Sequence, residues 1–420
     1  MKQTEIGLIP DDWEVKEFKQ EATLINGRAY AQSELLKQGK YKVLRVGNFG
    51  TNDTWYYSNL ELPEKQYCTK GDLLYCWSCT YGAYIWNEPN TIYHYHIWKI
   101  ISKGADKEYL KYILNNDTEN QMKTSNGSTM AHITKGFLEN RLFVFPPLPE
   151  QQRIAKALSD VDALISTTEK LIQKKKNIKQ GAMQNLLTGK KRLPGFTKSS
   201  NYKQTEIGLI PEDWEVKSLG EIFEFRPNNT FTRDCLNDSK GEYQNVHYGD
   251  VLIKYPSILD CSKESIPFIN EGINVKFSKY GIMEGDIIIA DTAEDETVGK
   301  VVEIFNLGEK KIVSGLHTFL CRKITDDFTP RWLGYFMNQS IFHNQLLPFI
   351  TGTKVSAISR TAIQNVKVLI PSKEEQTAIA NVLSSMDKEI ETLNTKLEKY
   401  RNLKTAMMQQ LLTGKIRLVK

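Results

Sequence analysis

The sequence contains few cysteines and no long hydrophobic run. Six cysteines in 420 residues are too sparse for a scaffold held by disulfides, which favours a reducing compartment. No apolar run approaches the roughly 20 residues that cross a bilayer, and the N-terminal segment lacks the apolar core of a signal peptide. These absences predict a cytoplasmic protein that does not enter a membrane.

The sequence also lacks a marked excess of charge of either sign. Its 55 Lys and Arg residues against 50 Asp and Glu residues give a net charge of +5, which argues neither for nor against a nucleic-acid partner. A hydrophobic content of 40% and a charged content of 25% match a folded protein and exclude wholesale disorder. The length exceeds one ordinary hydrophobic core, so we expect two or three domains.

What the sequence does contain is a long internal duplication. Residues 2–15 (KQTEIGLIPDDWEV) recur at 203–216 with 13 of 14 positions identical. Two further segments recur with one common offset: 149–165 matches 374–390, and LLTGKKRL (186–193) matches LLTGKIRL (411–418). Each half therefore has a similar opening, a divergent middle and a similar end. This order predicts one task carried out twice, on two different targets.

Each half ends in a predicted long helix, because apolar residues follow a 4-3 spacing without an interrupting proline. Gly189 and Gly414 mark the expected helix ends. The short linker between the halves favours an antiparallel coiled coil of the two helices, with a pseudo-two-fold internal repeat. The predicted seam consists of Ile154, Leu158, Val161, Ile165, Ile172 and Leu186 in the first helix, and of Ile379, Leu383, Met386, Ile390, Leu393, Leu397, Tyr400, Met407 and Leu411 in the second.

The divergent middles contain short β-rich runs bounded by Gly, Asn and Pro, which predict an α+β domain in each half. Strands are expected at 42–49, 71–77, 93–101, 142–146, 242–253, 285–290, 317–323 and 366–371, and helices at 106–116 and 329–339. The predicted order along the chain is a first domain (1–149), a first helix (150–189), a linker (190–202), a second domain (203–373), a second helix (374–414) and a tail (415–420).

This doubled motif set resembles the specificity subunit of type I restriction-modification systems. The resemblance depends on the IGLIPxDWEV openings, a variable domain, PPLPEQQRIA before a long helix and LLTGKxRL at its end, and it covers essentially the whole chain. It implies two α/β target recognition domains that each read one half of a bipartite sequence in double-stranded DNA. The two long helices, joined as an antiparallel coiled coil, would set the distance between the half-sites.

The resemblance also implies partners and cofactors. Two methylation subunits, which methylate adenine at N6, would dock on the coiled coil, and restriction subunits would translocate or cleave DNA. The chain itself would be noncatalytic and hold no cofactor, with S-adenosylmethionine, ATP and Mg²⁺ on the partner subunits. The alternative is a non-DNA coiled-coil scaffold that presents two ligand-binding domains; a steep loss of DNA affinity with rising salt would distinguish the two.

Motifs for catalysis are weak. Asp11 and Glu14 in PDDWEVK lie only three residues apart, whereas the acids of a nuclease metal site come from separate strands. An opening segment in which Ile9 and Trp13 pack on the domain explains the motif better. Neither a G-x-x-x-x-G-K-[ST] phosphate-binding loop nor a G-x-G-x-x-G motif occurs. We therefore predict no catalytic residue in this chain.

The cysteines give only a weak metal motif. Cys76 and Cys79, with nearby histidines, could contribute to a zinc site, but a single C-x-x-C pair is not specific. The aligned residues of the second half are Ala290 and Ala293, so the repeat does not require a metal there. We predict buried strand cysteines and no metal site.

Positive charge is concentrated in one segment. Between Glu169 and Lys198, nine Lys and Arg residues and one acid give a local charge of +8. This segment is predicted to be a solvated helix face, a surface near phosphates, or a docking surface for an acidic methylation subunit.

Candidate base contacts lie in loops, because amide, hydroxyl and guanidinium groups match base edges while lysine reads mainly phosphate. In the first domain the candidates are Arg28, Trp77, Tyr81, Lys123, Ser125, Asn126, Ser128 and Thr129. In the second domain they are Arg226, Asn228, Asn229, Arg233, Thr353, Lys354 and Ser356.

Overall fold

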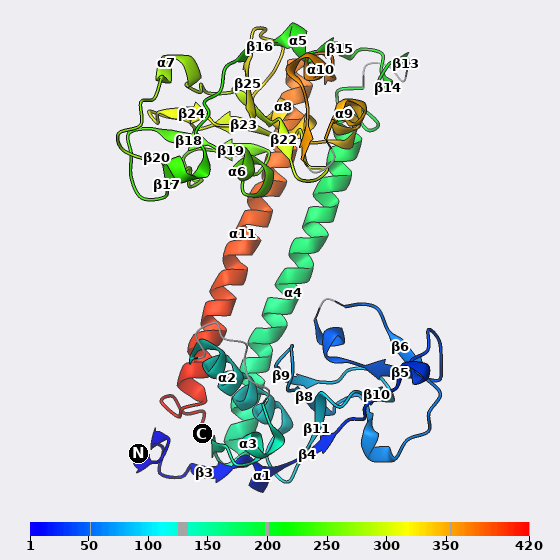
Figure 1. Cartoon of the computed structure of the whole chain (residues 1–420), viewed down its shortest axis with the longest axis vertical. Helices are drawn as coiled ribbons and strands as arrows, with labels where there is room; N and C mark the ends of the chain where they lie inside the picture. The colour runs from blue at the N-terminus through cyan, green and yellow to red at the C-terminus, as the bar shows by residue number, and fades with distance from the viewer. Residues whose placement is uncertain (51, 125–132, 198–200, 353–354, 420) are drawn as a thin grey trace. The chain divides into compact units, whose positions relative to one another are not determined.

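The chain folds into two compact units (Figure 1). The structure, a computed structural model, describes residues 1–50, 52–124, 133–197, 201–352 and 355–419. Unit 1 contains Met1–Lys170 and Asn394–Lys420, and unit 2 contains Leu171–Leu393. Each unit combines a β-rich domain with segments of two long helices, so the predicted α+β class with paired long helices is confirmed.

The long helices are α4 (Leu148–Leu186) and α11 (Lys373–Leu411), each of 39 residues. Gly189 and Gly414 follow them with φ of +70°, a left-handed conformation that ends a helix and that glycine adopts without strain. The structure places all fifteen predicted seam residues in buried or half-buried positions. Among the described residues, no helix has the length and apolar character that crossing a membrane requires.

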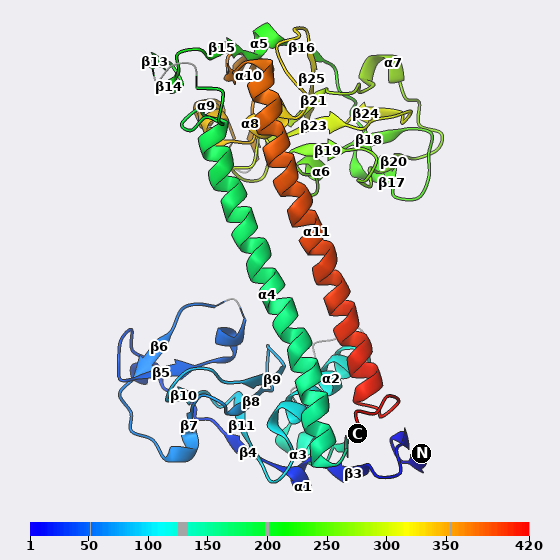
Figure 2. The same cartoon turned by 180° about the vertical axis from the view of Figure 1, so that it is seen from behind.

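Ion pairs between α4 and α11 show that the two helices run antiparallel in each unit (Figure 2). As the residue numbers rise along α4, those of the paired residues fall along α11. The pairs are Asp162–Lys404 and Glu169–Arg401 in unit 1, and Lys175–Glu389 and Lys179–Asp387 in unit 2. Because these pairs are partly exposed, each adds little stability, but together they favour one register of the helices.

The domain of unit 1 is built on an antiparallel sheet with the strand order β4-β11-β8-β9. The strands are β4 (Ala22–Asn26), β11 (Ile97–Ser102), β8 (Leu73–Cys76) and β9 (Gly82–Ile85). Helix α2 (Lys107–Thr124) packs against β9, and Trp98 and Tyr109 are buried in the shared core. A second sheet lies on the side away from α4 and contains, in order, β6 (Tyr56–Ser58), β5 (Tyr41–Leu44), β10 (Thr91–Tyr93) and β7 (Tyr67–Cys68).

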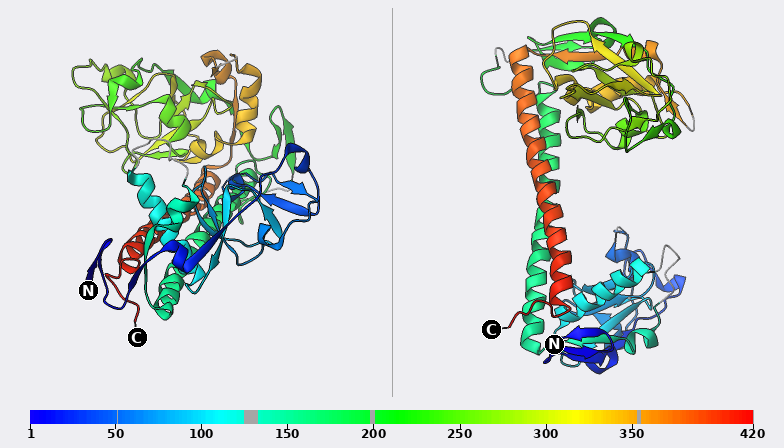
Figure 3. Two further views of the ribbon diagram at one scale, coloured as in Figure 1. Left: turned by 60° about the horizontal axis from the view of Figure 1, so that its bottom comes forward. Right: turned by 90° about the vertical axis from the view of Figure 1, so that its left-hand side faces the viewer.

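The domain of unit 2 repeats this framework with one additional strand in its main sheet. Figure 3 shows this domain, in green and yellow, beside its segments of the two long helices. Its main sheet contains, in order, β16 (Phe223–Arg226), β25 (Thr318–Lys323), β21 (Ile287–Ala290), β23 (Val301–Phe305) and β19 (Ile258–Asp260). Its second sheet contains β17 (Leu236–Asn237), β20 (Phe268–Ile269), β18 (Gln244–Val246) and β24 (Ile312–Ser314). In both domains one pair of the second sheet is parallel, β5 with β10 and β18 with β24.

The opening segment of each half pairs with the strand that directly precedes the long helix. In unit 1, β3 (Glu14–Glu17) pairs with β12 (Leu142–Phe145); in unit 2, β15 (Glu215–Ser218) pairs with β27 (Lys367–Ile370). A hairpin comes before each pair, formed by β1 (Lys2–Thr4) and β2 (Gly7–Ile9), or by β13 (Tyr202–Thr205) and β14 (Gly208–Pro211).

Three of the eight predicted strand runs are wrong in part. In 93–101, β10 ends at Tyr93 and β11 begins at Ile97, with a turn between them, and the two strands belong to different sheets. In 42–49, β5 ends at Leu44 and a 3₁₀ turn follows. In 242–253, β18 ends at Val246 and α6 (Tyr248–Ile253) takes the rest, because the His247 ring accepts the Gly249 N–H at 3.1 Å and caps a helix. The glycine and aspartate that follow are also poor strand formers.

The predicted helices differ in length from those observed. Helix α2 is longer than the expected 106–116. The expected helix 329–339 is reduced to α8 (Trp332–Phe336), followed by α9 (Ser340–Leu346). The break is held by Asn338, whose side chain exchanges hydrogen bonds with the Val301 backbone at 2.9 and 3.1 Å.

A buried glutamate at the start of α4 links the helix to the opening segment. The Trp13 indole N–H donates to Glu150 Oε2 at 3.0 Å, and Arg417 donates to both carboxylate oxygens at 2.7 and 2.8 Å. The same guanidinium donates two hydrogen bonds to Asp12 and lies over the Trp13 ring. Although burial acts to raise the pKa of Glu150, the hydrogen bonds from Arg417 and Trp13 hold it below its ordinary value. We name these four residues the clasp of unit 1.

Unit 2 contains the same clasp, formed by Asp213, Trp214, Glu375 and Arg192. Trp214 donates to Glu375 at 3.0 Å, and Arg192 bridges Glu375 and Asp213 at 2.5 to 3.0 Å. Arg192 follows α4, which starts in unit 1, whereas Arg417 follows α11, which starts in unit 2. Each domain is therefore closed by the helix end of the other half of the sequence.

A second repeated set of residues, which we name the tyrosine-acid-lysine set, joins each domain to both long helices. In unit 1, the Tyr112 hydroxyl donates to Asp162 at 2.7 Å, and Asp162 pairs with Lys404 at 2.7 Å. In unit 2, Tyr335 donates to Asp387 at 2.8 Å, and Asp387 pairs with Lys179. Burial and the neighbouring carboxylate raise the pKa of both tyrosines, so each hydroxyl keeps its proton. Each tyrosine comes from the domain, and the acid and the lysine come from different helices.

The glutamine after each clasp glutamate fixes the helix start to its domain. Gln151 accepts the Asp106 N–H at 2.9 Å and donates to the Pro146 carbonyl at 2.8 Å. Gln376 accepts the Thr329 N–H at 3.0 Å and donates to the Pro371 carbonyl at 2.9 Å. The repeated Glu-Gln pair thus has a structural role in both halves.

We expect the substitution Arg417→Ala to destabilise the N-terminal domain, although residue 417 lies near the other end of the chain. Glu150 is only 1% exposed and would lose its cation, which costs about 3 kcal/mol. Amide hydrogen exchange should become faster in the opening segment and at the start of α4, while unit 2 stays protected. Lys415→Ala, at an exposed position two residues away, is the control. Faster exchange in unit 2 alone would contradict the assignment of Arg417 to unit 1.

Candidate nucleic-acid interface

Polar and aromatic side chains gather at one edge of the main sheet of each domain. In unit 1 this edge is formed by the end of β4, the end of β8 and the start of β11, since Asn26 pairs with Trp98 and Cys76 with Ile97. In unit 2 the equivalent edge is formed by the ends of β16 and β21 and the start of β25. We name these the reading edges of units 1 and 2.

The reading edge of unit 1 is rich in aromatic rings. Trp77 lies 4.8 Å from His96 and 5.7 Å from Trp98 between ring centroids, and its indole N–H donates to the Tyr95 carbonyl at 3.0 Å. His94 continues the row, with its ring 4.9 Å from that of His96. Such rings offer stacking and apolar surface to a base.

A pocket opens beside these rings, with a cavity volume of about 280 Å³. It is lined by Asn26, Gly27, Trp77, Tyr95, Trp98, Ile133, Thr134 and Lys135. The pocket brings Trp77 and Asn26, the last residue of β4, next to residues 133–135. Three parts of the chain that are distant in sequence therefore meet at this edge.

The reading edge of unit 2 is polar. Asn228 donates to the Gly315 carbonyl at 3.1 Å, and Arg360 lies against β16, with its Nη2 3.5 Å from the Arg226 carbonyl. Ser356 lies in β26 (Ser356–Ala357), which pairs with β22 (Thr292–Ala293). The segment that contains Ser356 and Arg360 thus meets the end of β16 at this edge.

Several predicted contact residues have other partners. Arg28 forms a two-point ion pair with Glu34, and Arg226 pairs with Glu224. Arg233 pairs with Asp250 beside the second sheet. Asn229 is 1% exposed and donates to Asn245 at 2.7 Å, so it supports the edge from within.

The remaining candidates are divided between two groups. Tyr81 packs on the core of unit 1, and Lys123 is exposed near the end of α2. Six candidates lie outside the described residues: Ser125, Asn126, Ser128, Thr129, Thr353 and Lys354.

Sequence reasoning missed the histidines and one acid at these edges. His96 and His317 occupy equivalent positions, one residue before β11 and β25. Asp291 follows β21 directly and lies 3.4 Å from His317. Alignment of the two halves by their strands, rather than by their repeated motifs, would have identified the histidine pair.

Comparison with known proteins places the chain in a family. The family model described as the type I restriction modification DNA specificity domain matches residues 10–180 and again 211–399. The chain belongs to this family. As a specificity subunit it is a noncatalytic component of a type I restriction-modification enzyme, which decides against the non-DNA scaffold.

Similarity extends over the full length of relatives. The chain is 28% identical over 421 residues to the type I restriction enzyme MjaVIII specificity subunit of Methanocaldococcus jannaschii, covering 98% of this chain and 94% of that one. Identity to the EcoBI specificity subunit of Escherichia coli is 21% over 430 residues, covering 97% and 87%. The crystal structure of an S subunit from M. genitalium has a TM-score of 0.57 at 14% identity and covers 98% of each chain. That likeness shows the same fold.

The cations of the basic segment of the specificity subunit are divided between internal ion pairs and exposed positions. Three of its nine cations are used internally: Lys175 and Lys179 pair with α11, and Arg192 belongs to the clasp of unit 2. Five others are exposed: Lys170, Lys174, Lys176, Lys190 and Lys191. Exposed lysines make the surface around them suited to phosphates or to an acidic partner.

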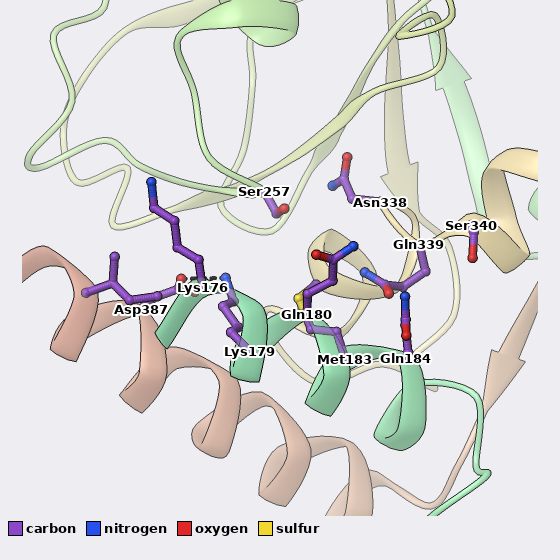
Figure 4. A pocket seen from close by; sticks show the side chains of 11 residues that line it. Lys176, Lys179, Gln180, Met183, Gln184, Ser257, Asn338, Gln339, Ser340 and Asp387 are labelled. Atoms are coloured by element: carbon purple, nitrogen blue, oxygen red, sulfur yellow. Dashed lines mark hydrogen bonds and ion pairs between the residues drawn. The ribbon is translucent and has the colours of Figure 1, made fainter. Parts of the chain in front are cut away.

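Part of this surface borders a pocket in unit 2 with a cavity volume of about 450 Å³ (Figure 4). Lys176, Lys179 and Gln180 line it from α4, and Ser257 and Asn338 line it from the domain. Lys179 is held by Asp387, as the dashed line in Figure 4 shows, whereas Lys176 is exposed.

The cysteines in and near the weak zinc motif differ in their exposure to solvent. Cys68 and Cys76 are buried and Cys79 is exposed. Burial raises the pKa of the Cys68 and Cys76 thiols, which disfavours the thiolates that zinc binds. No group of three or more potential ligands suited to a metal occurs within the described part of the chain.

We expect acid to destabilise unit 1 through His94. Burial, and then the neighbouring His96 and Arg45, lower the pKa of His94 to about 4, so the unfolded chain binds a proton that the folded domain rejects. The stabilisation is present above about pH 6.5 and is lost as the pH falls toward 4. His94→Gln should therefore reduce the drop in Tm between pH 7 and pH 5, and His343→Gln in unit 2 is the control. An unchanged drop in the His94 variant would refute this role.

Proposed function

We propose that the specificity subunit reads a bipartite sequence in double-stranded DNA, with one half-site for each reading edge. The observation that carries the proposal is that the two domains have a common framework but different side chains at their reading edges. The two domains share their sheets, clasps and tyrosine-acid-lysine sets, yet one edge is aromatic and the other polar. A repeated frame with unlike reading surfaces suits an asymmetric site.

The paired helices are proposed to set the distance between the half-sites. The clasps and the tyrosine-acid-lysine sets fix both ends of each helix to a domain, which makes the helix length a determinant of spacing. The corresponding chain segments are 1–149 and 203–373 for the target recognition domains, 150–189 and 374–414 for the helices, 190–202 for the linker and 415–420 for the tail.

The outer faces of the helices are proposed to dock two methylation subunits that methylate adenine at N6. Leu171 and Ile178 on α4 and Leu403 on α11 are large, exposed and outside the predicted seam. Beside Leu403, an apolar groove of about 340 Å³ includes Ala157 and Met407. Apolar surface of this kind favours a protein partner. S-adenosylmethionine on the methylation subunits, and ATP and Mg²⁺ on restriction subunits, would supply the chemistry.

Exchange of residues 17–145 for the equivalent part of another specificity subunit should change one half-site and leave the other unchanged. The exchanged segment contains the whole reading edge of unit 1 and no part of the long helices α4 and α11. Sequencing of methyladenine in the DNA of a host that carries the hybrid reads both half-sites at once. A change in both half-sites would refute independent reading, and the unaltered subunit in the same host is the control.

Insertion of seven residues into both helices, after Glu169 and after Leu393, should lengthen the spacer by about 3 base pairs. Seven residues add about 10 Å and two turns, so the seam keeps its face. The same methyladenine sequencing measures the spacing. Insertion into α4 alone is the matched control, because it misaligns the interhelical ion pairs and should lower activity. An unchanged spacing in the double insertion would refute the helices as a ruler.

A further inference from the structure

The two reading edges present different side chains at one equivalent position. Trp77 directly follows the last residue of β8, and Asp291 directly follows the last residue of β21. The Trp77 N–H donates to the His96 carbonyl at 3.2 Å, and the Asp291 N–H donates to the His317 carbonyl at 3.1 Å. The equivalence therefore rests on the same backbone hydrogen bond in both domains.

Asp291 is held in place by its surroundings but keeps an acceptor available. Its Oδ1 accepts the Thr292 hydroxyl at 2.7 Å and lies 3.4 Å from His317 Nδ1. Its backbone carbonyl accepts the Ile358 N–H at 2.9 Å, which ties it to the segment after β26. The side chain is 21% exposed, and Oδ2 has no hydrogen-bond partner among the described residues.

A carboxylate on a surface that binds DNA is unfavourable unless a specific interaction offsets its repulsion by the phosphates. In the major groove, the exocyclic amino groups at cytosine N4 and adenine N6 donate hydrogen bonds that a carboxylate can accept. Trp77 at the equivalent position of unit 1 has no acceptor, and its N–H is already bonded to Tyr95. The same framework position thus favours an amino group in unit 2 and an apolar contact in unit 1.

We propose that Asp291 is a specificity-determining residue, whose carboxylate accepts a hydrogen bond from the exocyclic amino group of a cytosine or adenine in the half-site read by unit 2. The inference rests on the proposed function of the reading edges. It adds the class of base at one position and the atom that recognises it.

The first test compares Asp291→Asn with the unaltered chain, each assembled with its methylation subunits. Glu294→Gln is the control, because it removes the same charge from an exposed position three residues away. Methylation of a randomised DNA library, read by sequencing, should show a roughly tenfold loss of preference at one base pair of the unit 2 half-site for Asp291→Asn alone. The unit 1 half-site should be unchanged in both variants.

The second test uses the unaltered complex, so it does not depend on the folding of a variant. In the unit 2 half-site, each cytosine is replaced in turn by 2-pyrimidinone and each adenine by purine, which lack the amino group. Affinity should fall roughly tenfold at one position, and the base replaced there identifies cytosine or adenine as the partner.

The outcomes separate this inference from the proposed function. If the unaltered complex reads a bipartite motif but neither Asp291→Asn nor any amino-free base changes the unit 2 half-site, the role of Asp291 is overturned. The same holds if Asp291→Asn and Glu294→Gln change affinity equally at all positions. If the unaltered complex reads no bipartite motif, the proposed function itself is overturned.

Discussion

The buried carboxylate at the start of each long helix is the interaction on which the rest of the structure depends. Glu150 and Glu375 each lie at the junction of three separate parts of the chain: the opening segment, a helix start and the end of the other helix. A buried charge is costly unless it is fully paired, so this junction forms only when all three parts are present. Because each carboxylate binds the arginine that follows a long helix, it fixes the end of that helix to the domain.

This arrangement separates what must stay constant from what can vary. The glutamate, the tryptophan, the arginine and the tyrosine-acid-lysine set recur in both units with nearly the same distances. The reading edges differ at equivalent positions and take no part in these interactions. A substitution at an edge can therefore change recognition without a large cost to the frame.

Much of the frame could be predicted from the sequence, because it depends on local periodicity. The 4-3 spacing of apolar residues is sufficient to place Ile154 and Leu383 on the seam, and the repeat is sufficient to predict two similar domains. The partner of Arg417 was not predictable, since Arg417 and Arg192 occur in nearly identical motifs and the sequence does not say which domain each one closes.

The reading edges were less predictable, because they depend on burial and on the meeting of distant segments. Asn229 has the composition of a contact residue, yet the Asn245 side chain and the surrounding core bury it. Asp291 was missed because an acid is an unexpected residue at a DNA surface, although the alignment of Cys76 with Ala290 already places it at the position of Trp77.

The division of unit 1 between the two ends of the chain has a consequence for biosynthesis. Unit 2 is a single continuous stretch of the chain. In unit 1, by contrast, the clasp and the helix pair are complete only after residues 394–420 have been synthesised. At the usual rate of translation, synthesis of the chain between the N-terminal domain and these residues takes roughly 10 to 50 s. Of the two domains, the one that leaves the ribosome earlier is thus finished later, and during this interval the apolar face of early α4 has no helix to cover it.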